Sequence, residues 1–266
     1  MTAMVNGGPG LSGLRAIVTG GGSGIGLATV RLLAASGAAV AALDLKPDAA
    51  CEPFDDAMHL AVPLGVRADV TEDASVRAAV DEVAGCFGGV DILINNAGVG
   101  AQGTIETNPY DEWHEVFDIN VVGIVRVTRA CLPYLRQSAS AAIVNTCSIV
   151  ATVGLPERVL YGATKGAVYA LTLAMAADHL SEGIRVNCVS PGTVDTPWVG
   201  RLLEKAEDPA AASAALRARQ PLGRLVSPNE VAAAIAYLAS PSAGAVTGTN
   251  LRIDGGLQGL RIPSRR

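Results

Sequence analysis

Short apolar runs recur along the chain, each followed by a longer segment that mixes polar and apolar residues. The runs are continuous and do not alternate between polar and apolar positions. Strands that are buried on both faces of a parallel sheet have this pattern. The sequence therefore predicts seven strands, over 15–19, 39–43, 62–67, 91–95, 142–147, 185–190 and 250–253.

The longer segments have the period of amphipathic helices, and glycine or acidic residues mark several of their ends. Strands that alternate with helices predict an α/β fold with a doubly wound parallel sheet and helices on both faces. We expect helices over 26–36, 71–87, 109–137 and 161–181, and one that begins at the Ser227–Pro228 cap.

The same pattern divides the chain into one main unit and two ends. We expect a glycine-rich, flexible lead-in over 1–13, a single domain over 14–257 and a tail over 258–266. Within the domain, 196–226 contains no strand pattern and is rich in Ala, Arg and Glu. We interpret it as a small helical lid over a substrate site.

Composition excludes several classes of protein. Half of the residues are hydrophobic and 17% are charged, which excludes a disordered chain. A net charge of -5 argues against nucleic-acid binding. The five cysteines are scattered, the three histidines form no metal-ligand pattern, and no apolar run is long enough to span a membrane. We therefore expect a cytoplasmic protein with no metal, membrane or nucleic-acid partner.

A glycine-rich turn lies between the first strand and the first helix. Residues 19–26 read TGGGSGIG, with the spacing Gly-x-x-x-Gly-x-Gly. Glycines let the backbone approach a pyrophosphate, and a helix N-terminus supplies free N–H groups. A flexible turn alone is the alternative, but the strand–turn–helix context favours a nucleotide site. The expected contacts are Gly20, Ser23, Gly24, Ile25 and Gly26.

Polar residues at the ends of later strands extend this predicted site. Asp44 lies 24 residues after Gly20, where a carboxylate can accept hydrogen bonds from both ribose hydroxyls and repels a 2′-phosphate. No Lys or Arg lies in the glycine turn, so the pattern favours NAD over NADP. Asp69 and Val70 follow the third strand, and 96–98 (Asn96, Ala97, Gly98) follow the fourth, at the edge where α/β sheets bind ligands.

A Tyr–Lys pair supplies candidate acid–base chemistry. Tyr161 and Lys165 share one helix face, and a nearby ammonium favours the phenolate needed for proton transfer. Lys165 is the only charged residue between Ala163 and Ala177, so a solvated face does not explain it. Ser148, at the end of the fifth strand, is placed to donate a hydrogen bond to a substrate oxygen.

These motifs together resemble the short-chain dehydrogenase/reductase family over residues 14–255. The matching positions occur in order and at the spacing of that family. They are Thr19–Gly26, Asp44, Asp69, Asn95–Gly98, Asn120, Ser148, Tyr161, Lys165 and 191–196. The resemblance implies a Rossmann-type fold, a nicotinamide cofactor and, commonly, a homotetramer.

The resemblance also implies roles for single residues. Tyr161 would exchange the proton with the substrate hydroxyl while Ser148 orients and polarises its oxygen. Lys165 would hold the nicotinamide ribose, and Asn120 would anchor a water that extends the proton relay. Further contacts to the nicotinamide end are implied for Pro191, Gly192, Val194 and Thr196.

A narrower resemblance concerns the substrate. Residues 191–197, with Arg201 and Arg219, resemble the branch of 2-keto-3-deoxy-L-fuconate dehydrogenases and cytosolic type-2 3-hydroxybutyrate dehydrogenases, and Arg158 fits the same pattern. In the hydroxybutyrate members these arginines bind the substrate carboxylate, as guanidinium groups are suited to do. Salt bridging with acidic residues at the surface is the alternative.

The leading hypothesis is an NAD-dependent oxidoreductase that transfers hydride between NAD(H) and a secondary alcohol or ketone, in a hydroxy acid or sugar acid. An NADPH-dependent 3-oxoacyl-(acyl-carrier-protein) reductase is an alternative, against which Asp44 counts. A non-catalytic NAD-sensing or scaffold protein is another, but such proteins tend to lose the Tyr–Lys pair, which is present here.

Overall fold

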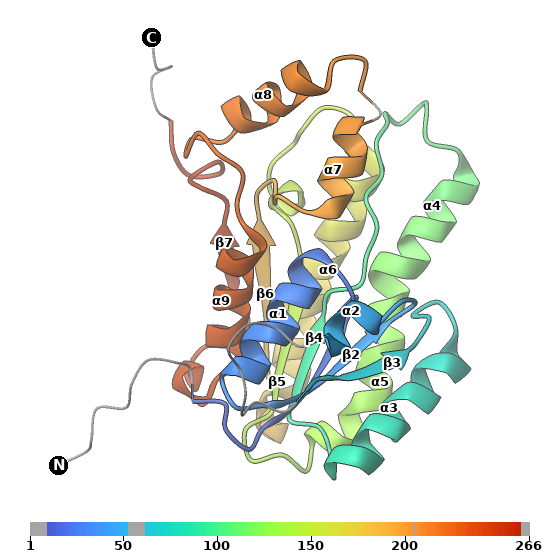
Figure 1. Cartoon of the computed structure of the whole chain (residues 1–266), viewed down its shortest axis with the longest axis vertical. Helices are drawn as coiled ribbons and strands as arrows, with labels where there is room; N and C mark the ends of the chain where they lie inside the picture. The colour runs from blue at the N-terminus through green and yellow to red at the C-terminus, as the bar shows by residue number, and fades with distance from the viewer. Residues whose placement is uncertain (1–9, 53–61, 205, 262–266) are drawn as a thin grey trace, which may run out of the picture.

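A parallel sheet of seven strands forms the centre of the protein (Figure 1). The computed structural model describes residues 10–52, 62–204 and 206–261. The strand order is β3-β2-β1-β4-β5-β6-β7, and every pair is parallel, so the predicted sheet is confirmed. The strands are β1 (Arg15–Thr19), β2 (Ala39–Asp44), β3 (Leu64–Arg67), β4 (Ile92–Asn95), β5 (Ala142–Thr146), β6 (Arg185–Pro191) and β7 (Asn250–Ile253).

Helices cover both faces of this sheet, as Figure 1 shows. The apolar residues of α1 and α9 belong to the core on one face, and those of α3, α5 and α6 to the core on the other. The helices are α1 (Gly24–Ala35), α2 (Asp48–Cys51), α3 (Asp73–Phe87), α4 (Tyr110–Phe117), α5 (Gly123–Leu135), α6 (Val159–His179), α7 (Pro197–Glu204), α8 (Pro209–Arg219) and α9 (Pro228–Ala239).

Neighbouring residues of a strand enter opposite cores, which explains the continuous apolar runs. In β1, Val18 packs with α1 and α9, whereas Ile17 packs with the helices of the other face, and neither side chain is exposed. Both faces of the strand must therefore be apolar.

The order of strands reverses between β1 and β4, which lie side by side. In open α/β sheets, ligands bind in the crevice beyond the carboxyl ends of the strands at such a point. The glycine turn after β1 and the loop after β4 both begin there, which places the predicted nucleotide site at this crevice.

The prediction of one long helix over 109–137 is wrong. The structure divides it into α4, a π-helical turn over Asp118–Val122, and α5. The π turn holds Asn120, whose side chain bonds both backbone groups of Val99. One extra residue in a helical turn does not change the apolar period enough to be seen in the sequence, although such turns are frequent at functional sites.

Most other differences from the expected elements are shifts of one or two residues at their ends. Leu11, however, lies within the expected flexible lead-in and is fully buried against the core. Residues 1–9 of that lead-in and 262–266 of the expected tail lie outside the described residues. The 196–226 excursion contains α7 and α8, and α8 has no buried residue. That this segment acts as a lid stays a prediction.

Among the described residues, one helical stretch, Val159–Glu182, is apolar and long enough to cross a membrane by length and composition. Most of it is α6, which packs against β6 and against the short turn Ile149–Ala151. It is therefore a core helix of this fold.

Candidate active site

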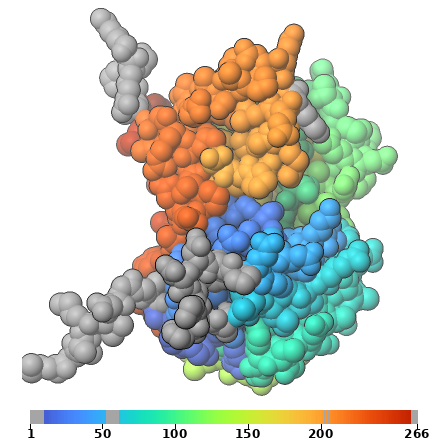
Figure 2. Space-filling view, in the orientation of Figure 1, coloured from blue at the N-terminus to red at the C-terminus, as the bar shows by residue number. Residues whose placement is uncertain are grey.

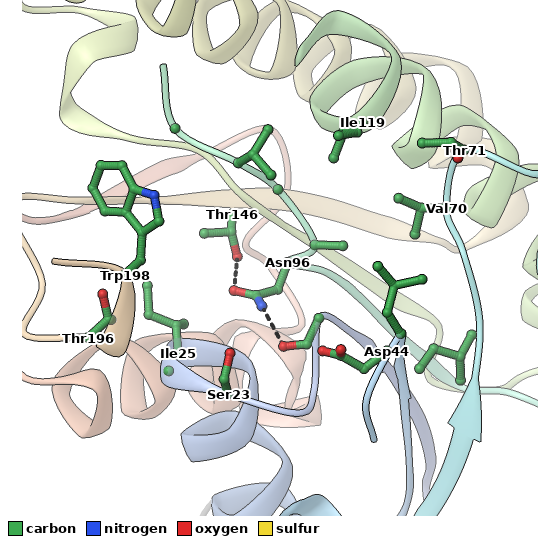
Figure 3. A pocket seen from close by; sticks show the side chains of 18 of the residues that line it. Ser23, Ile25, Asp44, Val70, Thr71, Asn96, Ile119, Thr146, Thr196 and Trp198 are labelled. Atoms are coloured by element: carbon green, nitrogen blue, oxygen red, sulfur yellow. Dashed lines mark hydrogen bonds between the residues drawn. The ribbon is translucent and has the colours of Figure 1, made fainter. Parts of the chain in front are cut away.

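A cavity of about 790 Å³ lies at the carboxyl edge of the sheet. Figure 3 shows it as an elongated cleft, with Asp44 and Val70 toward one end, Trp198 at the other, and Asn96 between them. Most of the cofactor residues expected from the sequence line it. They are Gly20, Ser23, Gly24, Ile25, Asp44, Asp69, Val70, Asn96, Ala97, Gly98, Tyr161, Lys165 and Thr196.

Eight other predicted site residues are absent from this lining, and two of them are the arginines Arg158 and Arg219. Gly26 is buried within α1, and Asn120 and Ser148 are almost completely buried behind the cleft. Three more follow or end β6, on the same edge of the sheet, and are Pro191, Gly192 and Val194.

The glycine turn presents bare backbone to the cavity. Gly20 and Gly24 have φ values of 64° and 53°, a region that favours glycine. At Gly26, a Cβ would overlap the carbonyl oxygen of Gly20, so a side chain there would force the turn open. This compact turn at the N-terminus of α1 fits the pyrophosphate of a dinucleotide.

Hydrogen bonds join the glycine turn to the loop after β4. The Thr19 hydroxyl accepts bonds from the backbone N–H groups of Asn96 (2.9 Å) and Ala97 (3.0 Å). The Asn96 side-chain amide donates to the Thr19 carbonyl (3.1 Å). Its oxygen accepts from the Thr146 hydroxyl (3.2 Å), as Figure 3 shows. Three strands are thereby fixed to one another around the centre of the cleft.

Two carboxylates lie at the far end of the cleft. Asp44 accepts backbone N–H bonds on both of its oxygens, from Gly22 and Lys46. Hydrogen bonds from Thr71 lower the pKa of Asp69, which keeps this group ionised. The first position fits a ribose diol, and the second, with Val70, fits the base beyond it.

Lys165 is held in place below the ring of Tyr161. Only 5% of Lys165 is exposed, and its Nζ donates to the Thr146 carbonyl at 2.8 Å. The same Nζ lies 5.7 Å from the centroid of the Tyr161 ring. Both residues line the cavity, so the predicted pair is assembled there with the ammonium close to the phenol.

Asn120 and Ser148 are held by neighbouring backbone. Asn120 donates to the Val99 carbonyl (2.9 Å) and to the Thr164 hydroxyl (3.1 Å), while its oxygen accepts from the Val99 N–H (2.8 Å). Ser148 follows β5, and its hydroxyl accepts from the Val150 N–H at 3.4 Å. Asn120 thus connects the loop after β4 to α6.

The three arginines occupy different parts of the site. Arg158 precedes α6; burial and Arg219 lower its pKa, against smaller opposing contributions from Glu157 and Tyr161. Arg201, on α7, lines the cavity. Within the described residues, none of the three arginines pairs with a carboxylate, so the surface salt bridges considered as an alternative are not observed.

Some lining residues were not anticipated from the sequence. Trp198 packs onto Gly100, where a Cβ would overlap the indole ring, and it connects α7 to the loop after β4. Trp198 could have been anticipated because it directly follows residues 196–197, which belong to a motif that the sequence assigns to the site. The carbonyl of Thr146, which holds Lys165, has no signature in a sequence because every residue has a carbonyl.

Comparisons with known proteins are consistent with this site. Residues 20–258 match a family model described as enoyl-(acyl carrier protein) reductase. The chain is 43% identical over 245 residues to cis-4-hydroxycyclohexanecarboxylate dehydrogenase of Sinomonas cyclohexanicum, covering 91% of this chain and 95% of that protein. It is 39% identical over 251 residues to L-fucose dehydrogenase of Bos taurus, covering 91% and 88%.

Two further relatives extend the range of named substrates. The chain is 35% identical over 252 residues to 3-oxoacyl-(acyl-carrier-protein) reductase of Thermotoga maritima, covering 93% of this chain and 98% of that protein. A solved structure of ligand-free aldohexose dehydrogenase from Thermoplasma acidophilum matches with a TM-score of 0.85 and 31% identity, covering 97% of this chain and 100% of that one.

Proposed function

We propose that this chain, which belongs to the short-chain dehydrogenase/reductase family, oxidises the secondary alcohol of a hydroxy acid with NAD⁺ as the hydride acceptor. Family membership makes it an oxidoreductase of alcohols or ketones. The proposal of an acid rests on one observation: Arg158 lies within the electrostatic influence of Arg219, Tyr161 and the neighbouring Glu157, and neither arginine forms a salt bridge within the described residues.

The cleft has the features that NAD(H) requires. We propose that the start of α1 binds the pyrophosphate, that Asp44 binds the adenosine ribose, and that Asp69 and Val70 flank the adenine. Lys165 would bind the nicotinamide ribose. Toward the nicotinamide we place Asn96, Ala97, Gly98, Pro191, Gly192, Val194 and Thr196. When bound, NAD⁺ supplies the acceptor for the hydride that leaves the carbinol carbon.

The acid–base work is assigned to this chain's own side chains. Tyr161, as the phenolate, accepts the hydroxyl proton of the substrate, and the ammonium of Lys165 stabilises the negative oxygen. Ser148 donates a hydrogen bond to the substrate oxygen and orients it. Asn120 is proposed to anchor a water that carries the proton onward, while its side chain holds the loop at Val99.

The substrate class follows from the arginines together with the relatives. A relative at 43% identity is named for cis-4-hydroxycyclohexanecarboxylate, which carries a secondary alcohol and a carboxylate on one small ring. The Arg158 guanidinium, with Arg219 in its electrostatic environment, is suited to hold such a carboxylate while the alcohol reaches the phenol of Tyr161. The likeness to the hydroxybutyrate branch is compatible with the same class. Alicyclic and short aliphatic hydroxy acids are therefore the first candidates.

The test compares a hydroxy acid with its methyl ester, each with NAD⁺ and with NADP⁺, and follows NADH or NADPH formation. We expect turnover of the acid with NAD⁺ and much weaker turnover of the ester. Equal turnover of acid and ester would contradict the proposed binding of the carboxylate by the arginines. Equal efficiency with both cofactors would contradict the proposed selection of NAD by Asp44.

The match to a 3-oxoacyl-(acyl-carrier-protein) reductase favours one alternative function. That function requires reduction of a carrier-bound ketone, which we expect to use NADPH. The position of Asp44 in the cleft counts against it. Preferential use of NADPH with a 3-oxoacyl thioester would establish this alternative in place of the hydroxy-acid proposal.

We also propose that the protein is a cytoplasmic homotetramer. Exposed apolar residues on α6 and in the preceding π turn, among them Leu173 and Val122, supply a surface that a second copy could cover. Sedimentation equilibrium of the purified chain tests this, and a monomer at micromolar concentration would overturn it.

A further inference from the structure

The carboxylate of Asp44 is held by two separate backbone segments. The N–H of Gly22, in the glycine turn, donates to Oδ2 at 2.9 Å. The N–H of Lys46, in the segment after β2, donates to Oδ1 at 2.9 Å. Both bonds are charge-assisted, and together they fix the orientation of the carboxylate at the end of the cleft.

This arrangement leaves accepting capacity on each oxygen. An ionised carboxylate has about four acceptor positions and no donor. Gly22 and Lys46 each use one, so both Oδ1 and Oδ2 can still accept a further bond. A vicinal diol, which offers two O–H donors, matches this pair of oxygens.

Gly22 has no room for a side chain. A Cβ there would overlap the carbonyl oxygen of Lys46 and would lie 3.0 Å from Cγ of Asp44. The φ of Gly22 is outside the positive region, so space and not backbone strain requires glycine at this position. A bulkier residue must push the Lys46 segment away from Asp44.

We propose that Gly22 and the backbone N–H of Lys46 are specificity-determining elements, because they lock Asp44 as an acceptor that cannot rotate away from a 2′-phosphate. This inference rests on the NAD preference in the proposed function. A free aspartate could swing aside to admit the phosphate. The locked one must first break two hydrogen bonds to backbone N–H groups.

The lock also predicts that Asp44→Asn is not a mild change. The Nδ2 of an asparagine would face the N–H of either Gly22 or Lys46, so a donor would meet a donor. We therefore expect Asp44→Asn to lose at least as much NADH affinity as Asp44→Ala. A free side chain would instead make Asp44→Asn the milder of the two.

The decisive experiment titrates NADH and NADPH into the purified protein and follows nicotinamide fluorescence, with no substrate present. Lys46→Pro deletes the backbone donor together with the lysine side chain, and Pro47 already restricts residue 46 to extended backbone. Lys46→Ala is the matched control, because it removes the side chain and keeps the N–H. We expect Lys46→Pro to narrow the NADH preference about tenfold and Lys46→Ala to leave it unchanged.

Gly22→Ala provides a second test if Lys46→Pro does not fold. It should narrow the NADH preference in the same direction as Lys46→Pro, because the displaced Lys46 segment releases Asp44. If the wild type prefers NADH but Lys46→Pro has the same cofactor preference as Lys46→Ala, the role of the two backbone N–H groups is overturned and the NAD preference stands. The same holds if Gly22→Ala leaves the cofactor preference unchanged. A wild type that binds both cofactors equally would instead overturn the NAD preference of the proposed function.

Discussion

The two ends of the cleft are built in different ways. At the end proposed for the cofactor, Thr19 and Asn96 connect the glycine turn to the loop after β4 through bonds of 2.9 to 3.1 Å. At the end proposed for the substrate, segment 196–226 forms part of the outer surface (Figure 2), and α8 has no buried residue. Gln220, which is 2% exposed and donates to the Thr193 hydroxyl, fixes the end of α8.

This difference separates two tasks. A cofactor that is the same in every turnover can be bound by a rigid frame of strands and short turns. A substrate that must enter and leave is better served by a segment with few buried contacts, which opens at low free-energy cost. The proposed acid–base pair, Tyr161 and Lys165, lies on α6, while two of the three arginines lie on the lid segment.

Tyr161→Phe should produce the largest effect and should separate chemistry from cofactor binding. Removing the hydroxyl deletes the acid–base group, which is worth about 10²–10⁴-fold in rate. The rigid end is untouched, so NADH affinity should stay within about twofold of wild type. The measurement pairs steady-state kcat on the native substrate with NADH titration. More than a tenth of wild-type kcat would contradict the role of Tyr161.

Arg219→Ala is expected to be the next largest change, and it tests the substrate end alone. Losing a charge-assisted hydrogen bond costs about 1.5–3 kcal/mol, or about 10–150-fold in kcat/KM for acids. The methyl ester of the same acid should be affected less than about twofold. Arg217→Ala, two residues earlier on the same exposed helix, is the matched control. Equal losses for acid and ester would show that Arg219 supports the fold of the lid segment instead.

The rigid end was also the part that the sequence predicted best. Glycines, strand-end carboxylates and the Tyr161–Lys165 spacing are each dictated by local geometry, so they can be recognised in the amino-acid sequence. The π turn at Asn120, the carbonyl of Thr146 and the contact of Trp198 with Gly100 depend on tertiary packing or on backbone atoms. No periodicity or residue type encodes them.

The substrate end was predicted less completely for a related reason. Arg158 and Arg219 are brought together only by the path of the chain between them, through α6, β6 and the two lid helices. The sequence indicated three candidate arginines but not which would be neighbours. The structure puts Arg158 within the electrostatic influence of Arg219 and places Arg201 on the wall of the cleft.

Asp91→Asn should show that stability and cofactor binding reside at opposite ends of the sheet. Asp91 precedes β4 at the end away from the cleft. Burial alone would raise the pKa of Asp91, but hydrogen bonds from Arg15 and Ser138 hold it below its ordinary value. A lowered carboxyl pKa contributes stability that is present above the ordinary value of about 3.9 and lost as pH falls through the folded value.

We therefore expect Asp91→Asn to lower the free energy of unfolding by about 1–3 kcal/mol at pH 7, because the Arg15 guanidinium loses its partner. The difference from wild type should shrink as the pH falls below about 4. Urea titrations at several pH values measure it, and NADH affinity at pH 7 should be unchanged. A difference that is independent of pH would exclude the charge of Asp91 as its cause.

Ser227→Ala should have the smallest effect, and it tests whether the base of the lid segment depends on α9. The Ser227 hydroxyl accepts from the Glu230 N–H at 3.2 Å, and the Glu230 carboxylate accepts from the Ser227 N–H at 2.8 Å, so both halves of a capping box are present. Losing the cap should cost about 1 kcal/mol of unfolding free energy. Ser227→Asp keeps a capping oxygen and should restore most of that loss.

The end of the lid segment is fixed independently of this cap, by backbone hydrogen bonds between Val226 and residues 193 and 195. The KM for the acid should therefore stay the same in Ser227→Ala. A KM that rises together with the loss of stability would mean that the lid segment depends on the α9 cap for its position.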